Sequence, residues 1–215
     1  SFLSPSATGL ADIDNAFSME FDGVDDKVVP NFLATGQTAI SISAWVNSDN
    51  IGAYQTIFGT VWANMEAFAL YIKDTGKLSL FLRNGGASPG YLDSNTTLSA
   101  STWYHVVVTL TPNGTNMDCT FYLNGVIDNT TGAAQAYGQG ENIVSTLNYE
   151  IGASGHYSNP TSGTWFEGKI DEVGIWDSVL STSDVEEIYD ATSSGKTADL
   201  SDLSTPPVAW YRMGD

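Results

Sequence analysis

Positive charge is scarce in this sequence: seven Lys and Arg stand against 25 Asp and Glu, which gives a formal net charge of −18. Nucleic-acid binding and attachment to anionic membranes both depend on clusters of Lys and Arg, so this composition excludes both partner classes. The single cysteine, Cys119, cannot form a disulfide within the chain. No apolar run approaches the roughly 18 residues of a transmembrane helix, and we expect no membrane insertion.

The residues that are abundant favour β-structure. Charged residues make up only 15% of the chain, whereas 21 Gly and 12% aromatic residues supply turns and strands. Apolar and polar residues alternate most clearly in residues 39–46. One face of that strand carries Ile40, Ile42, Ala44 and Val46, and the other carries Ser41, Ser43 and Trp45. Roughly ten short strands of this kind predict two packed antiparallel sheets. One short helix is expected after Ser181 or Ser183, either of which suits an N-cap.

Five stretches of the sequence, taken in order, carry a family resemblance. They are residues 21–26 (FDGVDD), 42–46 (ISAWV), 103–107 (WYHVV), 121–125 (FYLNG) and 166–176 (FEGKIDEVGIW). Together they resemble the laminin-G-like jelly roll of the concanavalin-A-like lectin/glucanase superfamily, over about residues 15–190. The resemblance implies an all-β, antiparallel two-sheet jelly-roll sandwich with one short C-terminal helix.

The C-terminus departs from this family. Its domains usually open with a strand of the type Val-Ala-Trp-Tyr-Arg-Phe, which residues 1–16 lack, whereas residues 208–215 read Val-Ala-Trp-Tyr-Arg-Met-Gly-Asp. We therefore expect an N-terminal arm (1–16), a sandwich (17–190), a linker (191–207) and a displaced strand (208–215).

Three arrangements of the displaced strand are open. It begins a second domain, folds back onto its own sandwich, or completes the sheet of a neighbouring copy. The residues expected to form the contact are Val208, Trp210, Tyr211 and Met213. Because an unpaired aromatic strand is a template for association, we hypothesise head-to-tail or strand-swapped self-association, or contact with other subunits of a surface assembly.

Carboxylates gather in the turn at residues 22–26. The resemblance implies a structural Ca²⁺ bound by Asp22, the carbonyl of Gly23, Asp25 or Asp26, and Asp171 from a late strand. Carboxylate and carbonyl oxygens are the ligands that Ca²⁺ takes in proteins. The alternative is a set of Asx-turns, in which the aspartates bond nearby backbone amides.

Catalysis is not expected. Glycosidases need two facing carboxylates, and Glu167 and Asp171 would lie about 13 Å apart along an extended strand. Of the two histidines, His105 sits in a predicted strand, and His156 has no cysteine or second histidine nearby. A glucanase-type glycoside hydrolase is therefore only a remote alternative.

Aromatic residues in predicted loops indicate a glycan site: Tyr91, Tyr137, Tyr157 and Trp165. The alternative for each is packing against the rim of the sandwich, and Trp45, Trp103 and Trp176 are expected to pack in the core. We predict a non-catalytic structural or adhesive subunit of an extracellular, cell-surface or virion-surface assembly. The alternative is a carbohydrate-binding, lectin-like module of a secreted or cell-surface protein.

Overall fold

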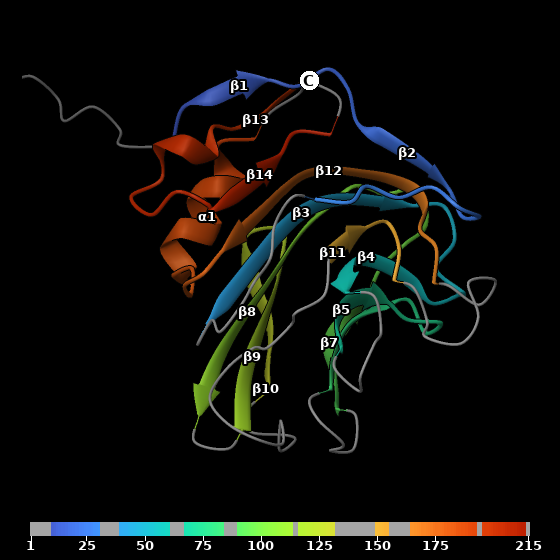
Figure 1. The fold of residues 1–215 in the computed structure, drawn as a ribbon. Helices are drawn as coiled ribbons and strands as arrows, with labels where there is room; N and C mark the ends of the chain where they lie inside the picture. Colours follow the sequence, from blue (N-terminus) through green and yellow to red (C-terminus); the bar gives the residue numbers. More distant parts are fainter. Residues whose placement is uncertain are drawn as a thin grey trace, which may run out of the picture.

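The computed structural model describes residues 10–30, 39–60, 67–83, 90–113, 116–131, 149–154, 164–192 and 195–213. Most of these residues form antiparallel strands in two layers, with one short helix outside them (Figure 1). The predicted all-β two-sheet sandwich with a short C-terminal helix is therefore confirmed. No helix in this described part of the chain is long and apolar enough to cross a membrane.

The larger sheet has seven strands in the order β10–β9–β8–β3–β12–β14, and β2 also pairs with β12. Its strands are β2 (Met19–Asp22), β3 (Ile40–Ser48), β8 (Tyr104–Asn113), β9 (Asn116–Leu123), β10 (Val126–Thr131), β12 (Glu167–Trp176) and β14 (Ala209–Tyr211). Strand β12 pairs with β3 on one side; on the other side it pairs first with β2 and then with β14. Both ends of the chain therefore meet at β12.

The smaller sheet has five strands in the order β11–β4–β5–β6–β7. They are β4 (Gln55–Thr60), β5 (Ala67–Ile72), β6 (Lys77–Arg83), β7 (Gly90–Thr97) and β11 (Tyr149–Ile151). The main core lies between the two sheets. The face of β3 predicted to be apolar is buried there, together with Leu70, Ile72, Leu78, Leu80 and Leu82 of the smaller sheet.

A second apolar cluster covers the outer face of the larger sheet. It comprises Val107, Tyr122, Trp176, Leu180, Val185, Ile188, Ala198, Leu200 and Leu203. Helix α1 (Thr182–Asp190) begins after Ser181, whose hydroxyl accepts from the Asp184 amide at 3.1 Å while the Asp184 carboxylate accepts from the Ser181 amide at 3.0 Å. This reciprocal capping box sets the start of the helix, and its apolar stripe then packs on the sheet.

The segment 191–207 was expected to be a linker, but its described residues are part of this outer layer. They contain β13 (Lys196–Ala198) and a 3₁₀ turn (Leu200–Asp202). Strand β13 pairs antiparallel with β1 (Asp12–Asp14), so this part of the expected N-terminal arm also belongs to the layer. Such a ribbon leaves no local pattern in the sequence, because its two short strands are far apart along the chain.

The displaced strand folds back onto its own sandwich in this structure. Strand β14 pairs with residues 173–175 of β12. Met213 is buried in the main core and Tyr211 packs against it, whereas Trp210 packs against the outer cluster. Val208, the residue before the strand, is 47% exposed. Of the three arrangements left open above, the structure contains the intrachain one.

Candidate functional site

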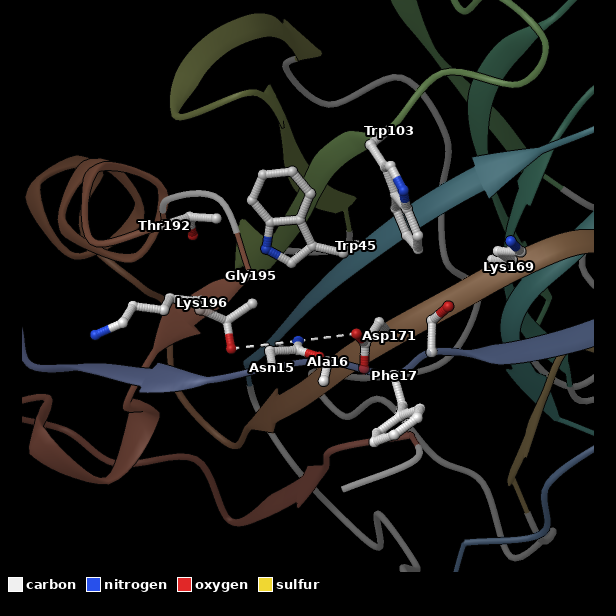
Figure 2. Close-up of a pocket in the computed structure, with 12 residues that line it drawn as sticks. Asn15, Ala16, Phe17, Trp45, Trp103, Lys169, Asp171, Thr192, Gly195 and Lys196 are labelled. Atoms are coloured by element: carbon white, nitrogen blue, oxygen red, sulfur yellow. Dashed lines mark hydrogen bonds between the residues drawn. The ribbon is translucent and has the colours of Figure 1, made fainter.

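An open pocket of about 400 Å³ lies on the outer face of the larger sheet, beside the β1–β13 ribbon (Figure 2). One wall is the arm at residues 15–18, and a second is Thr192 with residues 195–197. The sheet contributes Trp45, Trp103, Lys169 and Asp171. Its volume lies within the range of small-molecule binding sites, roughly 300–1,000 Å³.

The indole rings of Trp45 and Trp103 form one side of the pocket, and the ring of Phe17 lies on the other side, beyond Asp171 (Figure 2). The Trp45 indole stacks on the His105 imidazole, with ring centroids 5.3 Å apart, and on the Tyr189 ring at 5.9 Å. These two neighbours hold the half-buried Trp45 in place. Trp103 is 39% exposed and Phe17, from the arm, is more exposed still. The pocket thus presents one braced ring and two accessible rings.

Trp103 corrects an expectation from the sequence, which placed it in the core. It lies two residues before His105, whose side chain faces the outer layer beside Trp45. Because side chains alternate along an extended chain, Trp103 falls on the same outer face. Trp45 is likewise on this face and only half-buried, whereas Trp176 is fully buried as expected. The signal in the sequence was the polar face of residues 39–46, which Trp45 shares with Ser41 and Ser43.

His105 is a structural residue beneath the aromatic wall. It is fully buried, and its Nε2 lies 2.8 Å from the hydroxyl oxygen of Ser43. Burial lowers the pKa of His105 to about 3, so the imidazole is neutral near pH 7. This is the environment of a structural histidine, although among the described residues its Nδ1 has no hydrogen-bond partner.

Polar groups converge opposite the rings. The Asn15 side-chain amide donates to Asp171 Oδ2 at 2.9 Å and to Glu172 Oε1 at 3.2 Å, and it lies 3.4 Å from the Thr197 hydroxyl. The backbone amide of Glu172 donates to the other Asp171 oxygen at 2.8 Å. Asp171 is 6% exposed, so these donors stabilise a nearly buried carboxylate.

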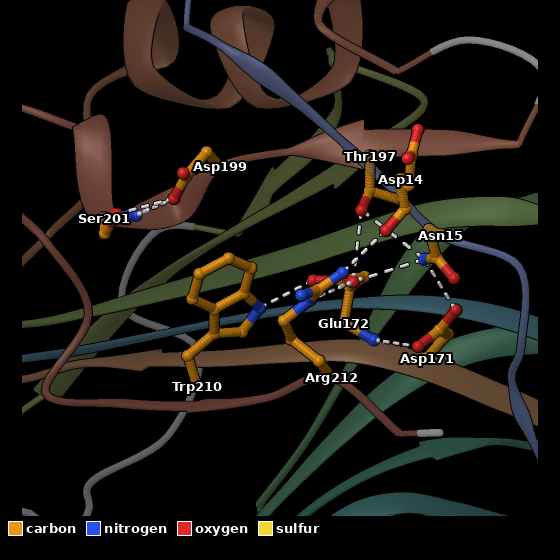
Figure 3. Close-up of polar contacts among 9 residues, drawn as sticks. All are labelled: Asp14, Asn15, Asp171, Glu172, Thr197, Asp199, Ser201, Trp210 and Arg212. Carbon is orange, nitrogen blue, oxygen red and sulfur yellow. Dashed lines mark hydrogen bonds and ion pairs between the residues drawn. The ribbon is translucent and has the colours of Figure 1, made fainter. Parts of the chain in front are cut away.

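Glu172, next to Asp171 in the chain, belongs to the same polar group (Figure 3). Its carboxylate accepts from Trp210 Nε1 at 2.6 Å and from the Thr197 hydroxyl at 3.1 Å, and it forms an ion pair with Arg212 at 3.5 Å. Burial raises the pKa of Glu172, opposed by the Trp210 and Thr197 hydrogen bonds. One carboxylate therefore contacts the arm, β13 and the C-terminal strand at once.

A β-bulge makes this arrangement possible. Regular alternation predicts that Asp171 and Glu172 point to opposite faces of β12, yet both accept a hydrogen bond from Asn15. The register between β12 and β3 shifts between Asp171 and Gly174, and Glu172 has a φ of +50°. Few non-glycine residues adopt this left-handed conformation, so the contacts of Glu172 must hold it there.

The structure brings Asp22, Asp25 and Asp26 together in an exposed group, with one carboxylate oxygen from each within 4.8 Å of the others. Asp22 accepts from the Val24 amide at 2.8 Å and the Asp25 amide at 3.3 Å, and Asp26 accepts from the Asp22 amide at 3.0 Å. These are the local turn bonds anticipated as the alternative to a metal. Among the described residues, no Lys or Arg forms an ion pair with the three aspartates.

Asp171 does not join this group. Asp22 lies opposite Glu167 in the pairing of β2 with β12, so Asp171 is four residues, or about 13 Å, further along the strand. Gly23, with a φ of +77°, lies against Glu167 instead: a Cβ built on it would come 3.1 Å from the Glu167 Cβ. Oxygen donors are the ligands that Ca²⁺ takes, so the turn residues fit the ion without Asp171.

Of the aromatic residues predicted to bind glycans, the structure describes Tyr91 and Trp165. Tyr91 is 50% exposed on the smaller sheet, where its ring lies 4.9 Å from Phe81 and Lys73 Nζ lies 5.5 Å from its centroid. Trp165 is half-buried just before β12. Tyr137 and Tyr157 lie outside the described residues. Neither Tyr91 nor Trp165 lines the pocket.

Comparison with known proteins agrees with this architecture. Residues 21–186 match the family described as the concanavalin A-like lectin/glucanases superfamily. No curated protein matches the chain in sequence.

Three solved structures illustrate the likeness. The heptameric SAP-like pentraxin from Limulus polyphemus has a TM-score of 0.62 at 17% identity, covering 90% of this chain and 89% of the pentraxin. The Ruminococcus gnavus IT-sialidase CBM40 bound to α2,3 sialyllactose has a TM-score of 0.60 at 18% identity, covering 84% of this chain and 99% of that module. Tailspike protein 2 from the Escherichia coli O157:H7 bacteriophage CAB120 has a TM-score of 0.61 at 13% identity, covering 93% of this chain but 27% of the tailspike. At these identities the likeness shows a shared fold.

Proposed function

Because the chain belongs to the concanavalin A-like lectin/glucanase superfamily, we propose that it is a non-catalytic carbohydrate-binding module and that the pocket beside the β1–β13 ribbon is its binding site. The observation that carries the proposal is the pairing of accessible indole rings with a fixed amide and carboxylate across one small pocket. Sugars offer both an apolar ring face and hydroxyl groups, so they suit a site that combines aromatic surface with a few placed polar groups.

The aromatic side and the polar side of the pocket have separate roles in this proposal. Trp103 offers its exposed ring for stacking, and Trp45 is already braced by His105 and Tyr189, so little side-chain freedom is lost on binding. On the opposite side, the side-chain carbonyl of Asn15 and the carboxylate of Asp171 accept hydrogen bonds from the hydroxyl groups of the sugar. The Ruminococcus gnavus module, which has this fold, is a carbohydrate-binding module with a bound sialyllactose, which supports the assignment.

The carboxylates favour binding over catalysis. Among the described residues that line the pocket, Asp171 is the one carboxylate, whereas glycoside hydrolysis ordinarily uses two. Glu172 is adjacent in sequence but does not line the pocket, and its oxygens are engaged by Trp210, Thr197 and Arg212.

A glycan array followed by calorimetry on the strongest-binding oligosaccharide tests the site. We expect Trp103→Ala to weaken that affinity at least about tenfold, equivalent to about 1.4 kcal/mol, and Trp103→Phe to restore part of it. Tyr91→Ala, on the smaller sheet, is the matched control and should leave the affinity unchanged. The reverse pattern would place the site at Tyr91, and an array with no binder would remove the proposed function.

We also propose that the turn at residues 22–26 holds a structural Ca²⁺ through Asp22, Asp25, Asp26 and the carbonyl of Gly23. The supporting observation is three carboxylates gathered without a described cationic partner. A ligand that binds only the folded state at about 100 times its Kd adds about 2.7 kcal/mol of stability. Thermal melts in calcium and in chelator should therefore differ for the native chain and converge for Asp25→Asn. Asp74→Asn, in another exposed turn, should keep the difference, and equal native midpoints would contradict the calcium site.

A structural or adhesive role in an extracellular or virion-surface assembly is the second proposal. Strand β14 lies at an edge of the larger sheet, and Val208, the residue before it, is exposed. A heptameric pentraxin and a phage tailspike protein share this fold, which supports the proposal. Sedimentation of the full chain over a wide concentration range is the direct measurement: oligomers support the assembly, and a constant monomer mass contradicts it.

A further inference from the structure

Glu172 lies at the junction of segments that are distant in sequence, and it contacts the pocket without lining it. Its carboxylate receives hydrogen bonds from two lining residues, Asn15 at 3.2 Å and Thr197 at 3.1 Å. The other oxygen, Oε2, accepts from Trp210 Nε1 at 2.6 Å, and Arg212 Nε lies 3.5 Å from Oε1, the oxygen that Asn15 and Thr197 share. Figure 3 shows the carboxylate between these two sets of partners.

We infer that Glu172 is a positioning residue for the pocket and that it makes the placement of Asn15 and Thr197 depend on the docked C-terminal strand β14. This inference rests on the proposed function only for what the pocket binds. The coupling itself is a property of the fold.

The contacts of Glu172 show how a change in strand β14 would reach the pocket. Glu172 is 4% exposed and has a φ of +50°, a conformation that its own residue type disfavours. The Trp210 hydrogen bond is the shortest that this carboxylate makes with a side chain, and it comes from the strand that closes the sheet edge. Without that donor, a buried carboxylate loses a large part of its stabilisation and must move or take up a proton. Either change alters the acceptors that Asn15 and Thr197 use.

Arg212 reinforces the same connection. Its guanidinium donates to the backbone carbonyl of Asp14 at 2.7 Å, immediately before Asn15 in the arm. It also lies 5.7 Å from the Trp210 ring. The C-terminal strand therefore holds the arm twice, through the carboxylate of Glu172 and through the carbonyl of Asp14. The arm at residues 15–18 is one wall of the pocket.

Hydrogen exchange followed by NMR tests the coupling without any saccharide. The probe is the backbone N–H of Asn15, which donates to the Gly195 carbonyl at 2.9 Å. Its exchange rate reports whether the arm stays packed against residue 195. Trp210→Phe keeps a ring and removes the indole donor. We expect this amide to exchange about fivefold faster or more in the variant, while amides of β8 keep their protection.

Trp176→Phe is the matched control. Its indole also donates one buried hydrogen bond in the outer layer, to the Thr205 carbonyl at 2.8 Å, but has no contact with Glu172 among those described. Exchange at Asn15 should be unchanged in this variant. If both variants accelerate Asn15 equally, or neither does, the inference is overturned. Should Trp210→Phe fail to fold, Glu172→Gln carries the same test.

Binding supplies the second measurement. For the strongest-binding oligosaccharide of the array, Trp210→Phe should reduce affinity about fivefold, and the effect should largely vanish in an Asn15→Ala background. A purely structural role for Trp210 would give the same loss in both backgrounds and would overturn the inference. If no saccharide binds the native chain, the proposed function fails while the exchange experiment still decides the coupling.

Discussion

Replacing Glu172 with Gln tests how a buried carboxylate stabilises this fold. The amide keeps the shape of the side chain but presents one NH₂ group where the carboxylate had an acceptor. One orientation places that group against Trp210 Nε1, and the other places it against Thr197 and Asn15. Either way at least one hydrogen bond to a charged acceptor is lost, worth about 1.5–3 kcal/mol.

The ion pair with Arg212 adds little to that figure, because the Arg212 side chain is 32% exposed and pairs near solvent contribute about 0–1 kcal/mol. The neutral amide avoids the desolvation that the carboxylate suffers, and this offsets part of the lost hydrogen bond. We therefore expect Glu172→Gln to lower the free energy of unfolding by only about 1 kcal/mol near pH 7. For a domain of this size that corresponds to a Tm lower by roughly 2–4 °C in a thermal melt.

The stability difference between the native chain and Glu172→Gln should also change with pH in a defined direction. Burial raises the folded-state pKa of Glu172 above its ordinary value of 4.5. A raised carboxyl pKa contributes stability that is fully present below 4.5 and is lost as the pH rises through the folded pKa. The glutamine variant lacks this titration, and the other titrating groups largely cancel between the two chains. Urea titrations should therefore show the advantage of the native chain shrinking as the pH rises. An advantage that grows with pH would refute the reasoning, since the hydrogen bonds and Arg212 would then outweigh desolvation.

Three other predictions follow from single contacts. Gly152→Ala should cost more than about 2 kcal/mol in urea unfolding, because its Cβ would lie 2.2 Å from Phe21 at a φ of +80°; a cost under 1 kcal/mol would contradict the packing. Since burial lowers the pKa of His105 to about 3, native stability should fall by up to about 1.4 kcal/mol per unit as the pH drops from 6.5 towards 3. His105→Gln should flatten that decline, and an unchanged slope would remove His105 as its source. Deleting residues 206–215 should lower the Tm of the monomer, because Met213 leaves the core; an unchanged Tm would show that β14 contributes little.

The strands and the helix were predictable because their signals are local. Alternation in residues 39–46 identifies the buried face of β3, because every second residue is apolar and these residues turn toward the core. The capping box at Ser181 and Asp184 depends on two residues three positions apart. Both features follow from neighbouring residues and need no knowledge of the rest of the chain.

The polar centre was not predictable by the same means. Regular alternation separates Asp171 from Glu172, and nothing adjacent to them in the sequence signals a bulge. Their common contact with Asn15 exists because residues far away in the chain supply donors that stabilise a left-handed Glu172. The placement of Asp171 in a calcium site with the aspartates at 22–26 was wrong because it came from the family resemblance alone. The pairing of β2 with β12 sets Asp22 opposite Glu167, and this register keeps Asp171 away from the turn.

The division between fold and site follows the boundaries of the family match. Residues 21–186 supply both sheets except β14 and the first two residues of β2, and with them most of the main core. The arm wall at residues 15–18, the second wall at Thr192 and residues 195–197, and the brace from Trp210 and Arg212 all lie outside that match. The shared core contributes a sheet face bearing Trp45, Trp103 and Asp171, but that face becomes a pocket only where the two flanks close over it. A relative that keeps the core and changes the flanks should therefore keep the fold while losing or changing what it binds, because the polar atoms opposite the rings are held by the flanks.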